Sequence, residues 1–294
     1  MITCADTPLV TIIMLAYNRE TFIAEAIEAI INQTYKNWEL IIIDNGSTDN
    51  TSTIIKLYSD HRIIHESYTQ NRFTGTVRNI AIRKASGELI AFADDDDIWM
   101  TDKLEKQVHQ LLQYPEAGFC YTNGYNFSKD SIQNLFLHKT NGIECDSIFI
   151  PYCKGECGIF LQTILVWREN IITAGLFEEN RTFADFKFIG NLTYHFKSVI
   201  LYEPLIKRRI HPSNSIYTYG RELSNEYVES LEFYLKNNML NSDVYSKGLF
   251  KYYVNGITTS ENISGRWGHF FNAIRIKPFS LIPFKKIIKS TLRL

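Results

Sequence analysis

The chain has 294 residues, of which 45% are hydrophobic and 14% aromatic, and its formal net charge is −1. This composition supplies a packed core and excludes a disordered chain, and the nearly neutral charge gives no sign of nucleic-acid binding. Five scattered cysteines favour a reducing, cytoplasmic environment over a disulfide framework. Met1 to Asp6 lacks the basic and apolar regions of a signal peptide, and no apolar run reaches the ~18 residues of a membrane span, so we expect neither.

The N-terminal part of the chain alternates strand and helix patterns. Continuous apolar runs predict buried strands, and apolar residues at helical spacing predict the helices between them. The predicted strands are Val10–Leu15, Trp38–Ile43, Ile63–Glu66 and Leu89–Ala93. The predicted helices are Phe22–Ile31, Thr51–Tyr58, Gly75–Ala85 and Asp102–Tyr114. This alternation predicts an α/β fold with a mostly parallel central sheet covered by helices on both faces.

The pattern is weaker in the second half. A strand is predicted to begin at Gly118–Tyr121, but Asn123–Tyr152 has no clear period. That stretch is either an excursion lining an acceptor site or an ordinary irregular connection. Helical patterns return in the stretches Glu169–Ala174, Phe186–His195 and Tyr217–Leu240.

The run Asp94–Asp97 directly follows the predicted strand Leu89–Ala93. Adjacent carboxylates repel one another, so the run suits a divalent cation or a phosphorylated ligand, although a solvated acidic loop has the same composition. Asp44–Asp49 and Tyr17–Arg19 follow two other predicted strands, and carboxyl ends of parallel strands share one edge of the sheet. Together these segments could form a nucleotide pocket, with an aromatic ring on the base and carboxylates on the ribose and a metal.

Other phosphate-binding motifs are absent from the sequence. There is no G-x-G-x-x-G after the first strand, no G-x-x-x-x-G-K-[ST] and no G-x-S-x-G. Without a glycine-rich cradle, a metal must carry the charge of the phosphates. This favours a nucleotide diphosphate leaving group over kinase chemistry.

In their order along the chain, these segments resemble the family 2 glycosyltransferases of the GT-A fold. The resemblance spans about Val10 to Ser215. Its matching pieces are Val10–Arg19, Gln33–Tyr35 with Trp38–Asp49, Arg78–Asn79 before Ser86–Glu88, Asp94–Trp99, Gly175–Glu178, Asp185 and Arg209–Pro212.

The resemblance implies inverting transfer of a sugar from a nucleotide diphosphate donor, most simply a UDP-sugar, with Mg²⁺ or Mn²⁺. By position, the resemblance implies that Tyr17, Asp44 and Asn45 line the nucleobase of the donor. It places Arg78 near the nucleobase or the phosphates, and Asp94 or Asp95 on the ribose. It assigns the metal to Asp96, the diphosphate to His211, also through the metal, and the general base to Asp185.

Two of these assignments have simpler alternatives, and the sequence departs from the family pattern at three positions. Asp185 could cap the helix that it precedes, and His211 could be an ordinary surface histidine. Leu15 stands where the family often has Pro, Asn45 where many members have a second Asp, and Ala184 where an acidic residue often precedes the base.

We expect a catalytic domain over residues 1–215, with a nucleotide-sugar-binding half (1–115) and an acceptor-binding half (116–215), and a helical extension over 216–294. Seven of the 31 basic residues and none of the 32 acidic ones lie between Asn262 and Leu294. In the basic amphipathic tail Phe284–Leu294, one helical face carries Phe284, Ile287, Ile288 and Leu292, and the other carries Lys285, Lys286, Lys289 and Arg293. The tail either lies on an anionic membrane or docks on the protein.

The leading expectation is a cytoplasmic glycosyltransferase, peripheral on the inner face of the cytoplasmic membrane. It would add a sugar to a glycan or lipid-linked glycan during synthesis of lipopolysaccharide, capsule or another surface polysaccharide. One alternative is a sugar nucleotidylyltransferase, which normally needs a glycine-rich loop that Leu15–Arg19 lacks. The other is an inactive glycan- or nucleotide-binding module, against which the intact acidic run and Asp185 argue.

Overall fold

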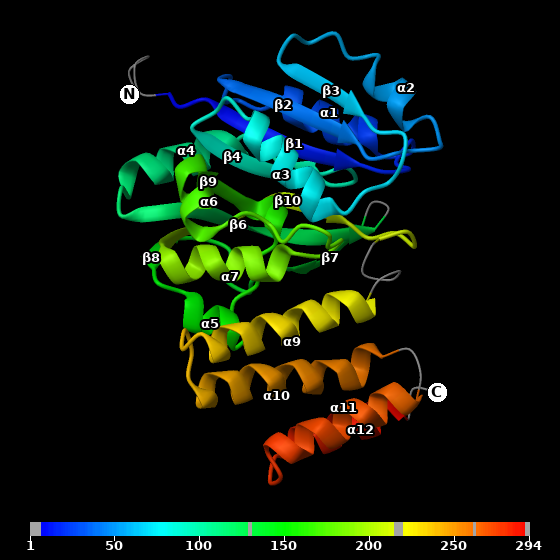
Figure 1. Cartoon of the computed structure of the whole chain (residues 1–294), viewed down its shortest axis with the longest axis vertical. Helices are drawn as coiled ribbons and strands as arrows, with labels where there is room; N and C mark the ends of the chain where they lie inside the picture. Colours follow the sequence, from blue (N-terminus) through cyan, green and yellow to red (C-terminus); the bar gives the residue numbers. More distant parts are fainter. Residues whose placement is uncertain (1–6, 129–130, 215–219, 261–262, 292–294) are drawn as a thin grey trace. The chain divides into compact units, whose positions relative to one another are not determined.

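The computed structural model describes residues 7–128, 131–214, 220–260 and 263–291 (Figure 1). Its contacts divide the chain into two compact units. The first consists of Met1–Ile148 and Gly158–Glu226, and the second of Phe149–Cys157 and Tyr227–Leu294. The segment Met1–Asp6, which lacks a signal-peptide pattern, and the tail residues Leu292 and Arg293 lie outside the described residues.

The first unit is built on a ten-stranded sheet with the strand order β3-β2-β1-β4-β9-β6-β10-β5, with β7 beside β6 and β8 beside β10. The strands are β1 (Val10–Ala16), β2 (Trp38–Asp44), β3 (Ile63–Ser67), β4 (Leu89–Asp94), β5 (Ile98–Trp99), β6 (Ala117–Ser128), β7 (Ser131–Leu135), β8 (Ile143–Asp146), β9 (Ile164–Trp167) and β10 (Lys197–Arg209). The first four strands in this order are parallel. Beyond β4 the sheet is mixed, because β9 runs antiparallel to both of its neighbours.

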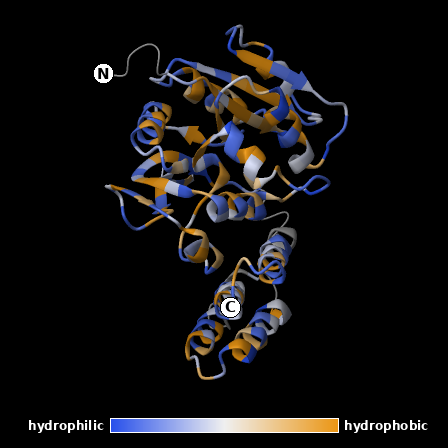
Figure 2. Ribbon diagram, turned by 60° about the vertical axis from the view of Figure 1, so that its left-hand side comes forward, coloured by the Kyte–Doolittle hydropathy of each residue, from blue (hydrophilic) through white to orange (hydrophobic). Residues whose placement is uncertain are grey.

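Helices cover this sheet on both faces. They are α1 (Ile23–Ile31), α2 (Thr51–Ile55), α3 (Thr74–Lys84), α4 (Lys103–Gln113), the short 3-10 helix η1 (Leu161–Thr163), α6 (Arg168–Ala174) and α7 (Asp185–His195). On one face, alternate residues of β1 and β4 share a core with Ile27 of α1 and Leu104 of α4. On the other, Phe92 of β4 meets Phe177 and Phe188 edge-on, with ring centroids 5.6 and 5.8 Å away. Burial on both faces explains why these strands are apolar along most of their length. Figure 2 shows orange, hydrophobic stretches on strands of the sheet.

The strands predicted from Val10, Trp38, Ile63 and Leu89 are confirmed to within one residue, as are the helices that follow the first, third and fourth of them to within two. The helix predicted over Thr51–Tyr58 ends earlier, at Ile55. The stretch without a clear period continues β6 to Ser128 and then forms β7 and β8 at the edges of the sheet. No strand was predicted for β9 or β10.

The second unit is helical. It contains α5 (Phe149–Cys153), the end of α9 (Gly220–Lys236), α10 (Ser242–Thr259), α11 (Ile263–Ile276) and α12 (Ile282–Thr291). The Asn241 side chain caps α10 by accepting the Val244 N–H at 3.0 Å. Ile257, Phe270 and Ile287 join α10, α11 and α12 in a small core. Among the described residues, no helix combines the length and apolarity needed to cross a bilayer.

Candidate active site

The segments that follow β1, β2 and β4 meet at one edge of the sheet. The parallel register places Ala16 beside Asp44 and Leu15 beside Asp94. The strand ends carry the segments that begin at Tyr17, Asn45 and Asp95 into the same region, as expected for parallel strands.

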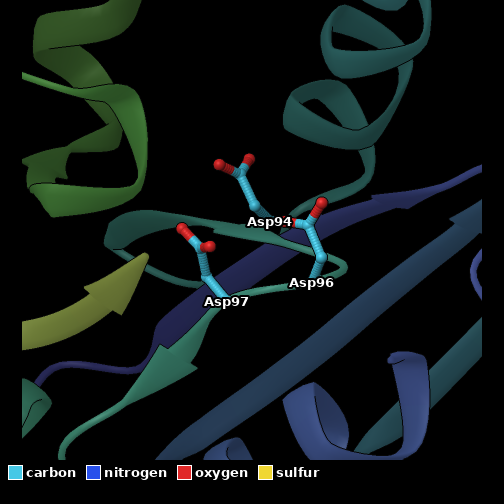
Figure 3. Close-up of side chains that lie close together, drawn as sticks. All are labelled: Asp94, Asp96 and Asp97. Atoms are coloured by element: carbon cyan, nitrogen blue, oxygen red, sulfur yellow. The ribbon is translucent and has the colours of Figure 1, made fainter. Parts of the chain in front are cut away.

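Three carboxylates cluster at this edge. One oxygen from each of Asp94, Asp96 and Asp97 lies within 4.8 Å of the others, and Figure 3 shows the three groups pointing into a common space. Burial and the neighbouring Asp96 raise the pKa of Asp94 to about 6. Burial, with Asp94 and Asp96, also raises the pKa of Asp97 well above its usual value. The cluster therefore holds carboxyl groups whose ionised forms favour a nearby positive charge.

Part of that charge comes from Arg19. Its Nε lies 3.2 Å from Asp95 Oδ1 and 3.3 Å from Asp96 Oδ2. The turn that delivers Arg19 is fixed by Asn18, which adopts a left-handed φ of 52° and accepts the Thr48 N–H at 2.8 Å. Asparagine tolerates this backbone conformation better than most residues.

His211 contacts the same carboxylate. Its Nε2 lies 2.9 Å from Asp96 Oδ2, and its Nδ1 lies 2.9 Å from Ser213 Oγ. A carboxylate oxygen and an unprotonated imidazole nitrogen are both acceptors, so this pair needs either a shared proton or a cation. Carboxylate oxygens and imidazole nitrogens are ligands of Mn²⁺ and related divalent ions, so these residues fit the implied metal.

Asp95 and Asp97 accept hydrogen bonds from other parts of the protein. Asp95 Oδ2 accepts the Tyr17 N–H at 3.0 Å. Asp97 accepts the backbone N–H of Arg209 at 2.9 Å and the Gln162 Nε2–H at 3.1 Å. These bonds fix the orientation of the acidic loop. Sequence reasoning gave no role to Arg19, Gln162 or the Arg209 backbone.

The predicted base-binding residues differ in how far their side chains are engaged. The Tyr17 side chain is exposed, with 40% of its surface accessible, whereas Asp44 is buried and accepts the Ser47 N–H at 2.9 Å. Asn45 donates to Asn71 Oδ1 at 3.0 Å and to the Arg72 carbonyl at 2.8 Å, and it accepts the Arg72 N–H at 3.1 Å. The Asn45 amide therefore anchors the loop at 71–72.

The predicted general base and a predicted donor-binding arginine form an ion pair. Arg78 Nη1 on α3 lies 2.5 Å from Asp185 Oδ1, the first residue of α7. The cap position of α7 belongs to Ala184, so Asp185 does not serve as its cap. Both members of this ion pair act on the pKa of Asp94, which Arg78 lowers and Asp185 raises, so their charges are felt at the acidic cluster.

A buried glutamate supports the start of α7. Glu226 accepts the Lys187 N–H at 3.1 Å and is 3% exposed. Burial, followed by the charge of Asp185, raises the pKa of Glu226 to about 7. No sequence signal pointed to this residue, which follows Asp185 by some forty positions.

A family model described as glycosyl transferase family 2 matches residues 11–165, more than half of the chain. The chain is 39% identical over 165 residues to the Escherichia coli UDP-Glc:alpha-D-GlcNAc-diphosphoundecaprenol beta-1,3-glucosyltransferase WfgD, a match that covers 55% of this chain and 62% of WfgD. It is 32% identical over 142 residues to the putative teichuronic acid biosynthesis glycosyltransferase TuaG of Bacillus subtilis, covering 47% of this chain and 56% of TuaG. Each match thus spans less than two thirds of the relative.

Two solved structures share the fold. Staphylococcus aureus TarS 1–349 in complex with UDP-GlcNAc has a TM-score of 0.68 at 14% identity, covering 96% of this chain and 88% of TarS. The mannosyltransferase PcManGT from Pyrobaculum calidifontis, in complex with GDP-Man and Mn²⁺, has a TM-score of 0.59 at 15% identity, covering 97% of this chain and 86% of PcManGT. The ordered strand-end motifs, the acidic cluster and the family match agree. The chain therefore belongs to glycosyl transferase family 2 and has the GT-A fold.

Proposed function

We propose that this enzyme transfers a sugar, with inversion, from a UDP-sugar to a hydroxyl of a lipid-linked glycan in cell-surface polysaccharide synthesis. The observation that carries the proposal is the cluster of Asp94, Asp96 and Asp97, on which the charges of the Arg78–Asp185 pair act. The cluster offers carboxylates for a cation, and Asp185 offers a carboxylate for a proton.

Asp96 and His211 would hold Mg²⁺ or Mn²⁺, with Asp94 and Asp97 close enough to share the ion. When bound, the cation offsets the negative charge of the departing diphosphate, so a separate general acid is not needed. The Mn²⁺ in PcManGT supports a divalent metal in this fold.

Asp185 would accept the proton of the acceptor hydroxyl. Its Oδ1 is held by Arg78, and we assign the acceptor to its second oxygen, Oδ2. A fixed carboxylate suits an inverting displacement, in which the hydroxyl attacks the anomeric carbon in line with the departing diphosphate.

Tyr17 and Asp44 would line the base, and Asp94 would take the ribose hydroxyls. Asn45 would act on the base through the loop that it anchors. The name of WfgD supports uridine and a lipid-diphosphate acceptor, and the UDP-GlcNAc complex of TarS supports uridine. The GDP-Man complex of PcManGT shows that a protein of this fold can also bind a guanosine donor. The four described cysteines are free thiols, which agrees with a reducing, cytoplasmic location, and peripheral attachment to the inner face of the membrane would bring the enzyme to a lipid-linked acceptor.

Thermal unfolding with UDP, GDP and dTDP, each with Mn²⁺ or with EDTA, tests the donor site. A ligand at 100 times its Kd adds about 2.7 kcal/mol to the unfolding free energy, so we expect a shift of several degrees for UDP with Mn²⁺. A rise in unfolding temperature with GDP or dTDP alone would show that the donor carries a nucleobase other than uracil. The absence of any shift would favour the inactive glycan-binding module.

Proton NMR of the reaction with UDP-sugars and a GlcNAc-diphospholipid then tests the chemistry. The expected result is release of UDP and a product whose anomeric configuration is opposite to that of the donor. Retention of configuration would exclude the single displacement. In a parallel assay with UTP and a sugar 1-phosphate, release of pyrophosphate would point to a nucleotidylyltransferase.

A further inference from the structure

The second unit exposes an unusual number of large apolar side chains on α11, α12 and the turn between them. Phe279 in the turn is 99% exposed. Five neighbours are each at least 40% exposed, and we call the six residues the apolar ridge: Trp267, Phe271, Phe279, Leu281, Phe284 and Ile288. A ring contact connects the two helices here, since the ring centroids of Phe270 and Phe284 lie 5.0 Å apart. Such exposed apolar groups on a small helical unit indicate an interaction site.

A basic surface combines Arg266 of α11 with three lysines of α12. Arg266, Lys285, Lys286 and Lys289, which we call the basic flank, line a cavity of about 460 Å³ together with Thr258, Ile282 and Ser290. Arg266 Nη1 donates to the Ser290 carbonyl at 3.0 Å, and Lys286 Nζ donates to Asn255 Oδ1 at 3.2 Å. Within the described part of the chain, none of the four forms an ion pair with a carboxylate. Their charge is thus available to an external anion.

The packing of α12 separates these two surfaces. Ile287 is 4% exposed and is buried against Ile257 and Phe270, so the helix is docked through this residue. Leu281, Phe284 and Ile288 lie at i, i+3 and i+7 on one side of that contact. Lys285 and Lys289 lie at i and i+4 on the side of the helix that faces away from that contact. The helix thus docks on the protein and still exposes an apolar and a basic side.

We propose that the α11–α12 hairpin is a docking surface for an anionic lipid bilayer, with the apolar ridge in the interfacial region and the basic flank on lipid phosphates (Figure 1). Apolar and aromatic side chains beside lysines are the arrangement that binds membrane surfaces without spanning them. A second copy of the chain fits this surface less well, because it would bring one basic flank against another. This surface would provide the proposed peripheral attachment, and its binding to lipid requires neither donor nor metal.

Sedimentation of the full chain with vesicles, in EDTA and without nucleotide, tests the surface. The probes are phosphatidylcholine vesicles and vesicles containing about one third phosphatidylglycerol. We expect binding to the anionic vesicles only, weakening as salt rises, because screening reduces the attraction of the lysines for the lipid. Equal binding to both vesicles, or to neither, would overturn the proposal.

Two variants separate the contributions. Lys285→Gln with Lys289→Gln should weaken binding about 30-fold, since each basic residue near an anionic surface contributes about fivefold. Phe279→Ser should weaken it about 10- to 100-fold, the range for withdrawing one large apolar side chain from the interface. The matched controls are Lys236→Gln on α9 and Leu57→Ser, both highly exposed outside the hairpin. If the hairpin variants bind as well as the controls, the hairpin is not the docking surface.

Trp267 supplies a direct spectroscopic readout. It is 40% exposed on the ridge, whereas Trp38 and Trp99 are buried. Its emission should shift to shorter wavelength on anionic vesicles, and brominated lipids should quench it. Trp267→Phe should remove the shift while vesicle binding persists. An unchanged spectrum with bound protein, or light scattering that shows a dimer formed through the hairpin, would contradict the proposal. Nucleotide-dependent unfolding would remain intact in either case, so failure here is distinguishable from failure of the proposed transfer.

Discussion

The acidic edge of the sheet and the basic flank of α12 are both clusters of like charge, but they are built in opposite ways. Asp95, Asp96 and Asp97 are each at most 9% exposed, and each accepts a hydrogen bond or ion pair from a residue far away in the chain. The side chains of Lys285 and Lys289 are exposed on α12, within a few residues of one another.

This difference follows from how charge responds to solvent. Buried like charges are costly, so they persist only where partners fix them in one geometry, and such geometry suits a small ligand. Exposed lysines cost little and remain adaptable, which suits an extended surface such as a bilayer. Substitutions at the acidic edge should therefore affect chemistry strongly, and those on the basic flank should affect only association.

The largest effect is expected for Asp96→Asn. This change removes the carboxylate shared by Arg19 and His211, so the rate of sugar transfer should fall about 10³-fold or more. UDP release measured with saturating Mn²⁺ checks this. Asp102→Asn, which removes a surface carboxylate paired with Lys106, is the matched control and should retain activity. Full activity of the Asp96 variant would end its assignment as a metal ligand.

The next effect is expected for Asp185→Asn. Loss of the base should lower kcat by about 10²- to 10⁴-fold, while the affinity for UDP changes by less than about threefold, because the proton is transferred only in the reaction. Turnover and calorimetric titration with UDP separate these quantities. Glu179→Gln removes an exposed carboxylate paired with Arg83 and serves as the control. A loss confined to UDP affinity would make Asp185 a donor-binding residue instead.

Lys103→Met extends the comparison to a buried cation. Burial lowers the pKa of Lys103 to about 7, and its Nζ donates to Gln107 at 2.7 Å. The charged form is disfavoured in the folded state, so the variant should be about 1–3 kcal/mol more stable at pH 7, after the lost hydrogen bond is counted. Between pH 7 and 9 the unfolded wild type still binds a proton that the folded state has released, so wild-type stability rises and the difference shrinks by about 2 kcal/mol.

Urea unfolding of both proteins at pH 7 and pH 9 measures this difference. The control is Lys236→Met, where 77% of the lysine side chain is exposed and no pH-dependent difference is expected. A destabilised Lys103 variant with the same pH slope as wild type would show that this lysine is held charged.

The smallest effect on the folded enzyme is expected for Lys285→Gln alone. Because the side chain is exposed on α12, the unfolding free energy should stay within about 0.5 kcal/mol of wild type. Transfer to a water-soluble acceptor should also stay within about twofold. A large loss of either would show that the basic flank supports the fold or the reaction.

The central strands and most helices of the first unit could be predicted because their signals are local. Val10–Leu15 and Leu89–Ala93 are buried on both faces, so apart from Thr11 they are apolar throughout. β9 and β10 could not be predicted in this way. β9 has only four residues, and β10 mixes the buried run Val199–Leu201 with the charged residues Lys207, Arg208 and Arg209 near its end. Their pairing depends on strands far away in the sequence.

The candidate site shows the same difference between local sequence signals and long-range contacts. The acidic run and the strand ends that carry it are predictable from local sequence, and the family resemblance adds Asp96, Asp185 and His211 as candidates. The groups that hold these side chains could be identified only from the fold. Gln162 reaches Asp97 across 65 positions, the Arg209 N–H reaches it across 112, and Arg78 reaches Asp185 across 107. Hydrophobic periodicity depends on residues that are close together in the sequence, whereas the partner of a buried charge depends on how the whole sheet packs.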